Sequence, residues 1–265
     1  VHGRDGELEE MNEWFDSRRP CMVIDGIAGI GKSTLVANWL EGRIEEEPNL
    51  SVCWYPCQIW DRELGLATSL LHRFGIDEKH DPYQLMETLP LSPGAVFNVD
   101  SWRRRLLAYL TDATAIRERF KDEAGGPPPY WLIVLDDIHH ISTHSKELLG
   151  ALLQMSTKAP LRLVMISRTS LDIYDRRDVH TRNIVCELSL KGLSIDEVSE
   201  WLESFEGEDV PSAGTIHNAT GGHPLAMELL ELYGTPEHED WLRFLDEEII
   251  IHMPKEERNH RLMNI

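Results

Sequence analysis

The feature that most constrains this chain is a glycine-rich stretch that separates an apolar run from a helical pattern. Residues 26–33 read Gly-Ile-Ala-Gly-Ile-Gly-Lys-Ser, which is the G-x-x-x-x-G-K-S pattern of a phosphate-binding loop. The apolar run at residues 21–24 precedes the loop, and apolar residues at 35, 36, 39 and 40 follow it at helical spacing. Strand, loop and helix in this order are the setting that the motif requires.

The loop residues predict a specific chemistry. Glycines at positions 26, 29 and 31 let successive backbone N–H groups face one anion, because no Cβ stands in the way. A helix that begins near Lys32 directs the positive end of its dipole at the same anion. We expect Lys32 to bind the β- and γ-phosphates and the Ser33 hydroxyl to bind Mg²⁺. The residues expected to bind the nucleotide are Gly26, Ile27, Ala28, Gly29, Ile30, Gly31, Lys32, Ser33 and Thr34.

A second apolar run ends in two acids. Residues 131–135 are Trp-Leu-Ile-Val-Leu, which suits a strand covered on both faces of a parallel sheet, and Asp136 and Asp137 follow. Open α/β sheets bind ligands at the carboxyl ends of their strands. We expect Asp136 to hold Mg²⁺, largely through water, and Asp137 to orient or activate the attacking water. The alternative for Asp137 is a helix-cap or loop acid.

Arg168 follows the next expected strand, at residues 161–166, in the dipeptide Ser167-Arg168. A guanidinium at this edge of the sheet would sense the γ-phosphate and stabilise charge in the transition state. The alternative is a surface salt bridge. Histidines at 139, 140 and 144 follow the acids, but no fourth ligand is evident, so a zinc site is disfavoured. No Asn-Lys-x-Asp motif that reads guanine occurs, so the expected cofactors are ATP or ADP with Mg²⁺.

Strand and helix patterns alternate up to about residue 190, which predicts a doubly wound α/β domain with a parallel sheet. Strands are expected at 21–24, 51–55, 131–135, 161–166 and 183–188, and helices at 8–15, 32–46, 61–74, 102–120 and 145–157. A short helix capped by Asp81-Pro82 is also expected. Beyond residue 190 the pattern is helical only, with a capping box at 194–197, a helix that ends at Gly221-Gly222 and another that begins at Pro224.

Composition limits the possible partners. The net charge of −20 argues against binding to nucleic acid or anionic lipid by this segment. No run of about 18 apolar residues occurs, so no membrane span is expected. Three of the four cysteines, at 21, 53, 57 and 186, lie in apolar runs, and we interpret them as reduced core residues of a cytoplasmic protein.

These pieces, in this order, resemble the STAND class of P-loop ATPases, which includes the NB-ARC modules of plant disease-resistance proteins and related prokaryotic regulators. Residues 3–8, Gly-Arg-Asp-Gly-Glu-Leu, resemble the GRxxEL signature of the class. Ser167-Arg168 resembles its sensor 1, residues 190–194 resemble the start of its small helical domain, and residues 221–225, Gly-Gly-His-Pro-Leu, resemble its GGxPLAL motif.

The resemblance implies a sheet order of 5-1-4-3-2 in a P-loop domain over residues 1–190. It also implies a helical lid over 191–243 and, over 244–265, a linker and the start of a winged-helix domain. Val1 and Arg4 would lie near the adenine and ribose, and Pro224 would pack on the nucleotide from the lid. ADP would hold the core and lid closed, and exchange for ATP would open the protein for self-association. The implied function is a slowly hydrolysing ATP switch in signalling.

Two other functions stay open. An origin-recognition-type ATPase that loads onto DNA shares this core, but it requires a basic face, which the net charge of −20 disfavours. A non-hydrolysing scaffold would keep ADP as a structural cofactor, and the intact pair Asp136-Asp137 argues against it.

Overall fold

The structure is a computed structural model that describes residues 3–90, 96–112, 115–116, 130–141, 143, 145–203 and 212–227. The chain divides into two compact units. One, here called the loop unit, comprises Val1–Met11, Gly26–Trp39 and Ser189–Ile265, and the other, the sheet unit, comprises Asn12–Asp25 and Leu40–Leu188. The phosphate-loop motif thus belongs to the loop unit, and the acids at 136 and 137 belong to the sheet unit. The domain boundaries expected at residues 190 and 243 stay a prediction.

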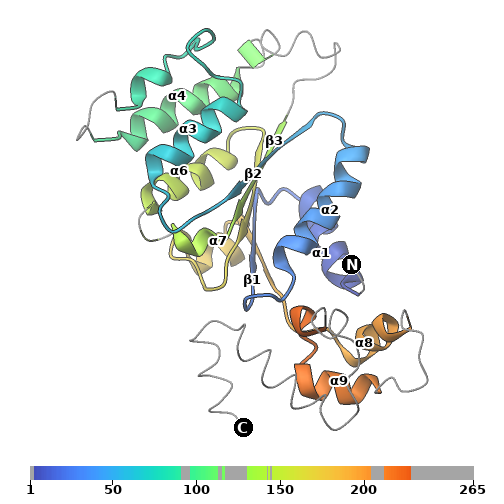
Figure 1. The fold of residues 1–265 in the computed structure, drawn as a ribbon. Coiled ribbons are helices and arrows are strands. Elements are labelled where there is room, and N and C mark those ends of the chain that lie inside the picture. The colour runs from blue at the N-terminus through green and yellow to red at the C-terminus, as the bar shows by residue number, and fades with distance from the viewer. Residues whose placement is uncertain are drawn as a thin grey trace. The chain divides into compact units, whose positions relative to one another are not determined.

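A five-stranded sheet forms the centre of the sheet unit (Figure 1). Its strands are β1 (Cys21–Asp25), β2 (Leu50–Pro56), β3 (Tyr130–Asp136), β4 (Leu161–Ile166) and β5 (Val185–Ser189). They lie in the order β2-β3-β4-β1-β5, which is the expected 5-1-4-3-2 read from the opposite edge. The pairs β2–β3, β3–β4 and β1–β4 are parallel. The prediction of a P-loop-type parallel sheet is therefore confirmed.

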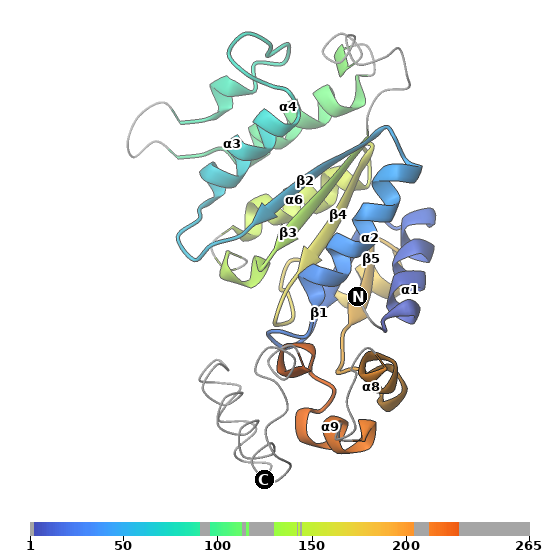
Figure 2. The same ribbon diagram turned by 45° about the vertical axis from the view of Figure 1, so that its right-hand side comes forward.

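The continuous apolar runs explain why these segments are central strands. Trp131 to Leu135 of β3 are all almost fully buried, as a strand covered on both faces requires. Alternate residues of β3, from Trp131 to Leu135, and of β4, from Leu161 to Met165, contribute to one core with three helices. Figures 1 and 2 both show these helices on one side of the sheet. The three helices are α3 (Glu63–Arg73), α4 (Val99–Thr111) and α6 (Lys146–Ser156).

The helix predicted over residues 102–120 is wrong in its extent. It ends at Thr111, because Asp112 leaves the helical region with φ −89° and ψ 90°. The Asp112 carboxylate accepts hydrogen bonds from the Ala115 N–H at 3.2 Å and the Tyr83 hydroxyl at 2.8 Å. An aspartate that binds backbone N–H groups ahead of it ends one helix and caps a new turn. Residues 113 and 120 of the predicted apolar face lie outside the described residues.

Asp81 also acts differently from its prediction. Its carboxylate accepts from the N–H groups of Leu85 at 2.6 Å and Met86 at 2.7 Å. A 3₁₀ helix, η1 (Met86–Thr88), is found in place of the expected helix at Pro82. The reason is that the Asp81 carboxylate accepts from the N–H groups of Leu85 and Met86, which lie further along the chain. Two other predicted helices are found as α1 (Asp5–Asp16) and α2 (Lys32–Glu46). A short helix that was not predicted, α7 (Arg176–His180), follows β4. His139 and His140 lie in the 3₁₀ helix η3 (Ile138–His140), and His144 lies outside the described residues.

The loop unit contains the helices that follow the sheet. The predicted capping box is present: the Ser194 and Glu197 side chains each bond the other's backbone N–H at the start of α8 (Ile195–Leu202). Helix α9 (Ala213–Thr220) ends at Gly221 with φ 63°, a left-handed conformation that favours glycine. Leu193, Val198, Trp201, Ile216, Ala226 and Met227 form the small core of this part. The segment expected at 244–265 lies outside the described residues.

Two further predictions concern the whole chain. All four cysteines are free, and three of them are buried, as expected for core thiols; Cys186 is partly exposed. Within the described ranges, none of the helices combines the length and the apolar character needed to cross a membrane.

Candidate functional site

The phosphate loop has the backbone conformation that its glycines predict. Gly26, Gly29 and Gly31 have φ values of 147°, 72° and 93°, which L side chains rarely adopt. Helix α2 begins at Lys32, and the first bond of its ladder runs from the Leu35 N–H to the Gly31 carbonyl at 2.8 Å. The loop therefore leads directly into a helix N-terminus, where an anion is stabilised.

Lys32 is held against its own loop. Its Nζ donates to the carbonyls of Gly26 at 2.7 Å and Ile27 at 2.8 Å, and only 6% of the residue is exposed. These bonds fix the ammonium group beside the loop. Ser33 and Thr34 follow in the first turn of α2 and are exposed.

The segment at 223–225 packs directly on the phosphate loop within the loop unit. The His223 Nε2 lies 2.9 Å from the Ala28 carbonyl oxygen. A Cβ at Gly29 would come within 2.9 Å of both the His223 ring and the Leu225 side chain, so only glycine fits there. The Pro224 ring is 4.0 Å from the position of a Cβ on Gly31. Pro224 therefore lies beside the loop, and its contact with a nucleotide stays a prediction.

Arg4 joins three parts of the loop unit. Its guanidinium bonds the Glu7 carboxylate at 2.6 Å, the Ile30 carbonyl of the phosphate loop at 3.2 Å and the Lys191 carbonyl at 2.7 Å. Its backbone N–H donates to the Glu197 carboxylate at 2.9 Å. Arg4 is 4% exposed and has φ 81°, which is unusual for a residue with a side chain. These contacts of Arg4 are all with protein groups, and its predicted contact with adenine or ribose stays a prediction. Val1 lies outside the described residues.

The Glu197 carboxylate is held in its charged form. Burial raises its pKa, but hydrogen bonds from the Ser194 and Arg4 N–H groups, together with the Arg4 charge, outweigh this and leave the pKa below its ordinary value. Sequence reasoning identified Glu197 only as part of a capping box. Its second partner is 193 positions away, which no local pattern reveals.

Asp136 and Asp137 end β3 at the carboxyl edge of the sheet, as predicted. Asp136 pairs with Pro56 at the end of β2, and its carbonyl accepts from the Cys57 N–H at 2.8 Å. Asp137 adopts a left-handed conformation, φ 52°, and its N–H donates to the Asp136 Oδ1 at 3.0 Å. This bond fixes one oxygen of the Asp136 carboxylate.

Arg168 lies beside Asp137. Its Nε is 3.6 Å from the Asp137 Oδ1, and the His139 Nδ1 is 3.8 Å from the same oxygen. The preceding residue, Ser167, is fully buried and donates its N–H to the Ile24 carbonyl at 2.9 Å, which places the end of β4 next to the end of β1. The structure thus brings Asp137 and Arg168 together. An ion pair this exposed contributes little stability.

Cys57 is a neighbour of the acids that sequence reasoning treated only as a core residue. Burial, and then the negative charges of Asp61, Asp136 and Asp137, raise the pKa of its thiol to about 12. The thiol therefore stays protonated beside the acids. The sequence could have shown that Cys57 lies beside the acids, because it directly follows β2 and so lies at the same edge of the sheet as Asp136.

The residues present fit a magnesium nucleotide in part. The loop glycines, the buried Lys32 and the start of α2 fit a polyphosphate. Mg²⁺ needs few protein ligands and keeps several waters, so one hydroxyl and one carboxylate suffice. Ser33 belongs to the loop unit and Asp136 to the sheet unit, so their joint use stays a prediction. In the part of the chain that the structure describes, no group of three His, Cys, Asp or Glu side chains could hold a metal by itself.

Solved structures show the same fold at low sequence identity. The STAND protein PH0952 from Pyrococcus horikoshii, which has a tetratricopeptide repeat sensor, matches with a TM-score of 0.57 and 20% identity over 98% of this chain and 33% of that one. This chain thus spans about a third of that protein's length. The Aeropyrum pernix ORC1 protein in complex with DNA matches with a TM-score of 0.55 and 15% identity over 96% of this chain and 69% of that one.

A third solved structure is the HORMA:CdnC:Trip13 complex of E. coli MS115-1, one chain of which matches with a TM-score of 0.51 and 13% identity, over 93% of this chain and 88% of that one. No curated protein matches the chain. The family model described as AAA ATPase domain matches residues 1–166, which is more than half of the sequence. That stretch contains the phosphate loop and the acids after β3, and the chain belongs to the AAA ATPase domain family.

Proposed function

We propose that this chain is the nucleotide-binding core of a STAND-type ATP switch, which binds Mg-ATP, hydrolyses it slowly and changes conformation on nucleotide exchange. The observation that carries this proposal is the packing of His223, Pro224 and Leu225 on the phosphate loop. Residues 223–225, which are far from the loop in sequence, contact the loop that would hold the phosphates. A change at the phosphates is therefore transmitted to these residues without any intermediate element.

Each site residue has a role in this proposal. Lys32 and the loop amides bind the β- and γ-phosphates, and Ser33 and Asp136 hold Mg²⁺, which neutralises phosphate charge when bound. Asp137 orients the attacking water. Arg168 exchanges its contact with the Asp137 carboxylate for a contact with the γ-phosphate.

Arg4 supports the switch from the other side of the loop. Its guanidinium bonds both the Ile30 carbonyl of the phosphate loop and the Lys191 carbonyl, which precedes α8. The loop and the start of the helical segment therefore share one side chain. In the full-length protein, opening of these contacts after ATP exchange would expose surface for self-association in the cytoplasm.

The experiment measures ADP and ATP binding by thermal shift with Mg²⁺, and phosphate release by turnover assay. Lys32→Ala is expected to abolish binding, because it removes the ammonium that compensates the phosphate charge. Lys158→Ala, at an exposed position, is the matched control and is expected to bind as the unmodified chain does. Asp137→Ala is expected to keep binding and to lower turnover. Absence of any nucleotide-dependent shift in the unmodified chain would refute the proposal.

The same measurements separate the two other functions. A DNA-loading ATPase of the origin-recognition type predicts DNA binding that weakens steeply with salt, which a gel shift at moderate salt detects. The likeness to the ORC1 protein is one of fold, and the net charge of −20 opposes DNA binding by this segment. A scaffold that only holds ADP predicts co-purified ADP with no turnover.

A further inference from the structure

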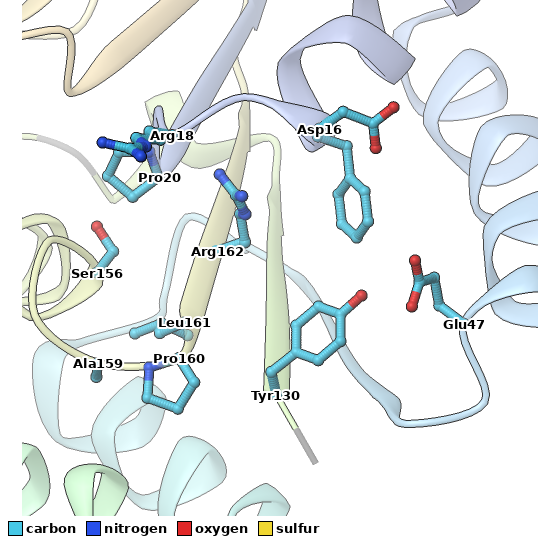
Figure 3. A pocket seen from close by; sticks show the side chains of 11 residues that line it. Asp16, Arg18, Pro20, Glu47, Tyr130, Ser156, Ala159, Pro160, Leu161 and Arg162 are labelled. Carbon is cyan, nitrogen blue, oxygen red and sulfur yellow. The ribbon is translucent and has the colours of Figure 1, made fainter. Parts of the chain in front are cut away.

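A pocket of about 430 Å³ lies at the amino end of the sheet, within the sheet unit (Figure 3). Pro20 directly precedes β1, Tyr130 opens β3 and Leu161 opens β4, and all three line the pocket. Asp136 lies at the opposite end of β3, six residues from Tyr130, which corresponds to about 20 Å along the strand. The pocket is therefore separate from the acids at the carboxyl edge.

Arg162 is a charged side chain of this pocket that several protein contacts hold in place. Its two terminal nitrogens donate to the carbonyls of Arg19 at 2.6 Å and Ser17 at 2.7 Å. Its guanidinium also lies over the rings of Trp14 and Phe15, 5.9 and 5.7 Å from their centroids. Two carbonyls and two rings thus fix its orientation in advance of any ligand.

The charge of Arg162 is not neutralised by these contacts. Backbone carbonyls orient a guanidinium but carry no net charge, and among the described residues no carboxylate forms an ion pair with Arg162. Burial lowers the pKa of Arg162, despite the nearby Tyr130 and Asp16. A half-buried cation without a paired carboxylate gains from an anion in reach of its remaining N–H groups.

A carboxylate lies on another side of the same pocket. Figure 3 shows the hydroxyl of Tyr130 directed toward the carboxylate of Glu47. Burial, and then the charge and hydrogen bonding of Glu47, raise the pKa of Tyr130 to about 12. The other acid of the lining, Asp16, already pairs with Arg43 at 3.5 Å. Glu47 is therefore the acceptor available to a cationic ligand group.

We propose that this pocket binds a free α-amino acid with a large apolar side chain. The carboxylate of the ligand binds the Arg162 guanidinium, its ammonium group faces Glu47, and its side chain packs against Phe15 and Leu161. The volume of the pocket lies in the range of small-molecule sites.

The charges favour a zwitterion over a simple acid or amine. The lining carries two arginines, at 18 and 162, and two acids, at 16 and 47, so its formal charges balance. The net charge of −20 repels a free anion at long range, whereas a zwitterion is not repelled. An amine without a carboxylate would leave the charge of Arg162 unpaired.

The test uses L-phenylalanine as the probe and measures its affinity for the purified chain by calorimetry and ligand-observed NMR. 3-Phenylpropionate lacks the ammonium group and phenethylamine lacks the carboxylate, and each is expected to bind at least about tenfold more weakly. Glu47→Gln is expected to weaken phenylalanine roughly fivefold and to leave phenylpropionate unchanged. The matched control is Glu45→Gln, which removes the same charge from an exposed position outside the lining and is expected to change nothing.

Arg162→Gln is expected to abolish binding of phenylalanine. If Arg162→Gln fails to fold, Glu47→Gln still tests the pocket. Saturating ADP and the Lys32→Ala variant are expected to leave phenylalanine binding unchanged, so the result is independent of the nucleotide site. No binding of phenylalanine at about 10 mM would overturn the proposal. So would equal affinity for the three probes, equal effects of the two glutamate variants, or competition by ADP.

Discussion

Glu197→Gln should loosen the start of α8 and the N-terminal segment at the same time. One Glu197 oxygen accepts from the Arg4 N–H at 2.9 Å, and the other accepts from the Ser194 N–H at 2.6 Å. An amide keeps one acceptor oxygen and presents an NH₂ group in place of the other. One of the two backbone donors then faces another donor, and it loses a charge-assisted hydrogen bond.

The magnitude follows from that single lost bond. A hydrogen bond to a charged group contributes about 1.5–3 kcal/mol, and the Glu197 side chain is only partly buried, so water compensates for part of the loss. We expect the free energy of unfolding to fall by about 1 kcal/mol, and the Tm by about 2–4 °C for a domain of this size. Amide hydrogen exchange should accelerate at Arg4 or Ser194, since these two N–H groups are the donors involved.

The pH dependence gives a second readout. A carboxylate whose pKa falls on folding stabilises the fold above its ordinary pKa of 4.5, and this stabilisation is lost as the pH falls through the lower folded-state pKa. Glutamine does not titrate. The stability difference between Glu197→Gln and the unmodified chain should therefore be complete at pH 7 and should shrink below about pH 4.5.

Glu200→Gln is the matched control, because Glu200 is exposed on the same helix. If Glu197→Gln were no more destabilising than Glu200→Gln, or if exchange at the Arg4 and Ser194 amides did not change, the carboxylate would not hold these segments together. A stability difference that stayed constant from pH 7 to below the ordinary glutamate pKa would equally refute the charge-assisted bonds.

Three further substitutions or reactions test other parts of the structure. Gly29→Ala should lower the free energy of unfolding by about 1–3 kcal/mol and weaken ADP binding, because φ at Gly29 is 72° and the added Cβ has no room. Gly42→Ala, in open space on α2, is its control and should be neutral or stabilising in the same denaturation assay. Asp112→Ala should lower the free energy of unfolding by about 1 kcal/mol, since it removes the acceptor for the Tyr83 hydroxyl and for a helix-capping N–H; unchanged stability in urea would contradict this. Cys57 should react slowly with a thiol reagent at pH 8, because its pKa is about 12 and it is buried; labelling as fast as in the unfolded chain would contradict this.

The strands could be predicted from the sequence because continuous apolar runs have one physical use in this fold. A run such as residues 163–166 must be covered on both faces, and β4 (Leu161–Ile166) ends where the run does. The order of the strands came from the resemblance to a known class, since no local pattern specifies which strands are neighbours. The helix predicted over 102–120 failed at Asp112, because periodicity records apolar positions and not a carboxylate that competes for backbone N–H groups.

The site was predictable to the extent that it is local in sequence. The loop 26–33 has positive φ at its three glycines, and α2 begins at Lys32 as expected. Phosphate binding by Lys32 stays a prediction. The partners of Arg4 were not predictable, because Lys191 and Glu197 are 187 and 193 positions away. The same holds for the contact between His223 and the Ala28 carbonyl, which joins positions 195 apart.

These long-range partners change how the resemblance should be interpreted. A signature arginine next to a nucleotide site suggests a side chain that binds the ligand, yet the Arg4 guanidinium donates to two backbone carbonyls and to Glu7. Three bonds at 2.6 to 3.2 Å use most of its directional donors, and 4% exposure leaves little room for a ligand to approach it. These bonds fix the Ile30 carbonyl of the phosphate loop, and we propose that Arg4 supports nucleotide binding through this contact. Its predicted contact with adenine or ribose stays a prediction.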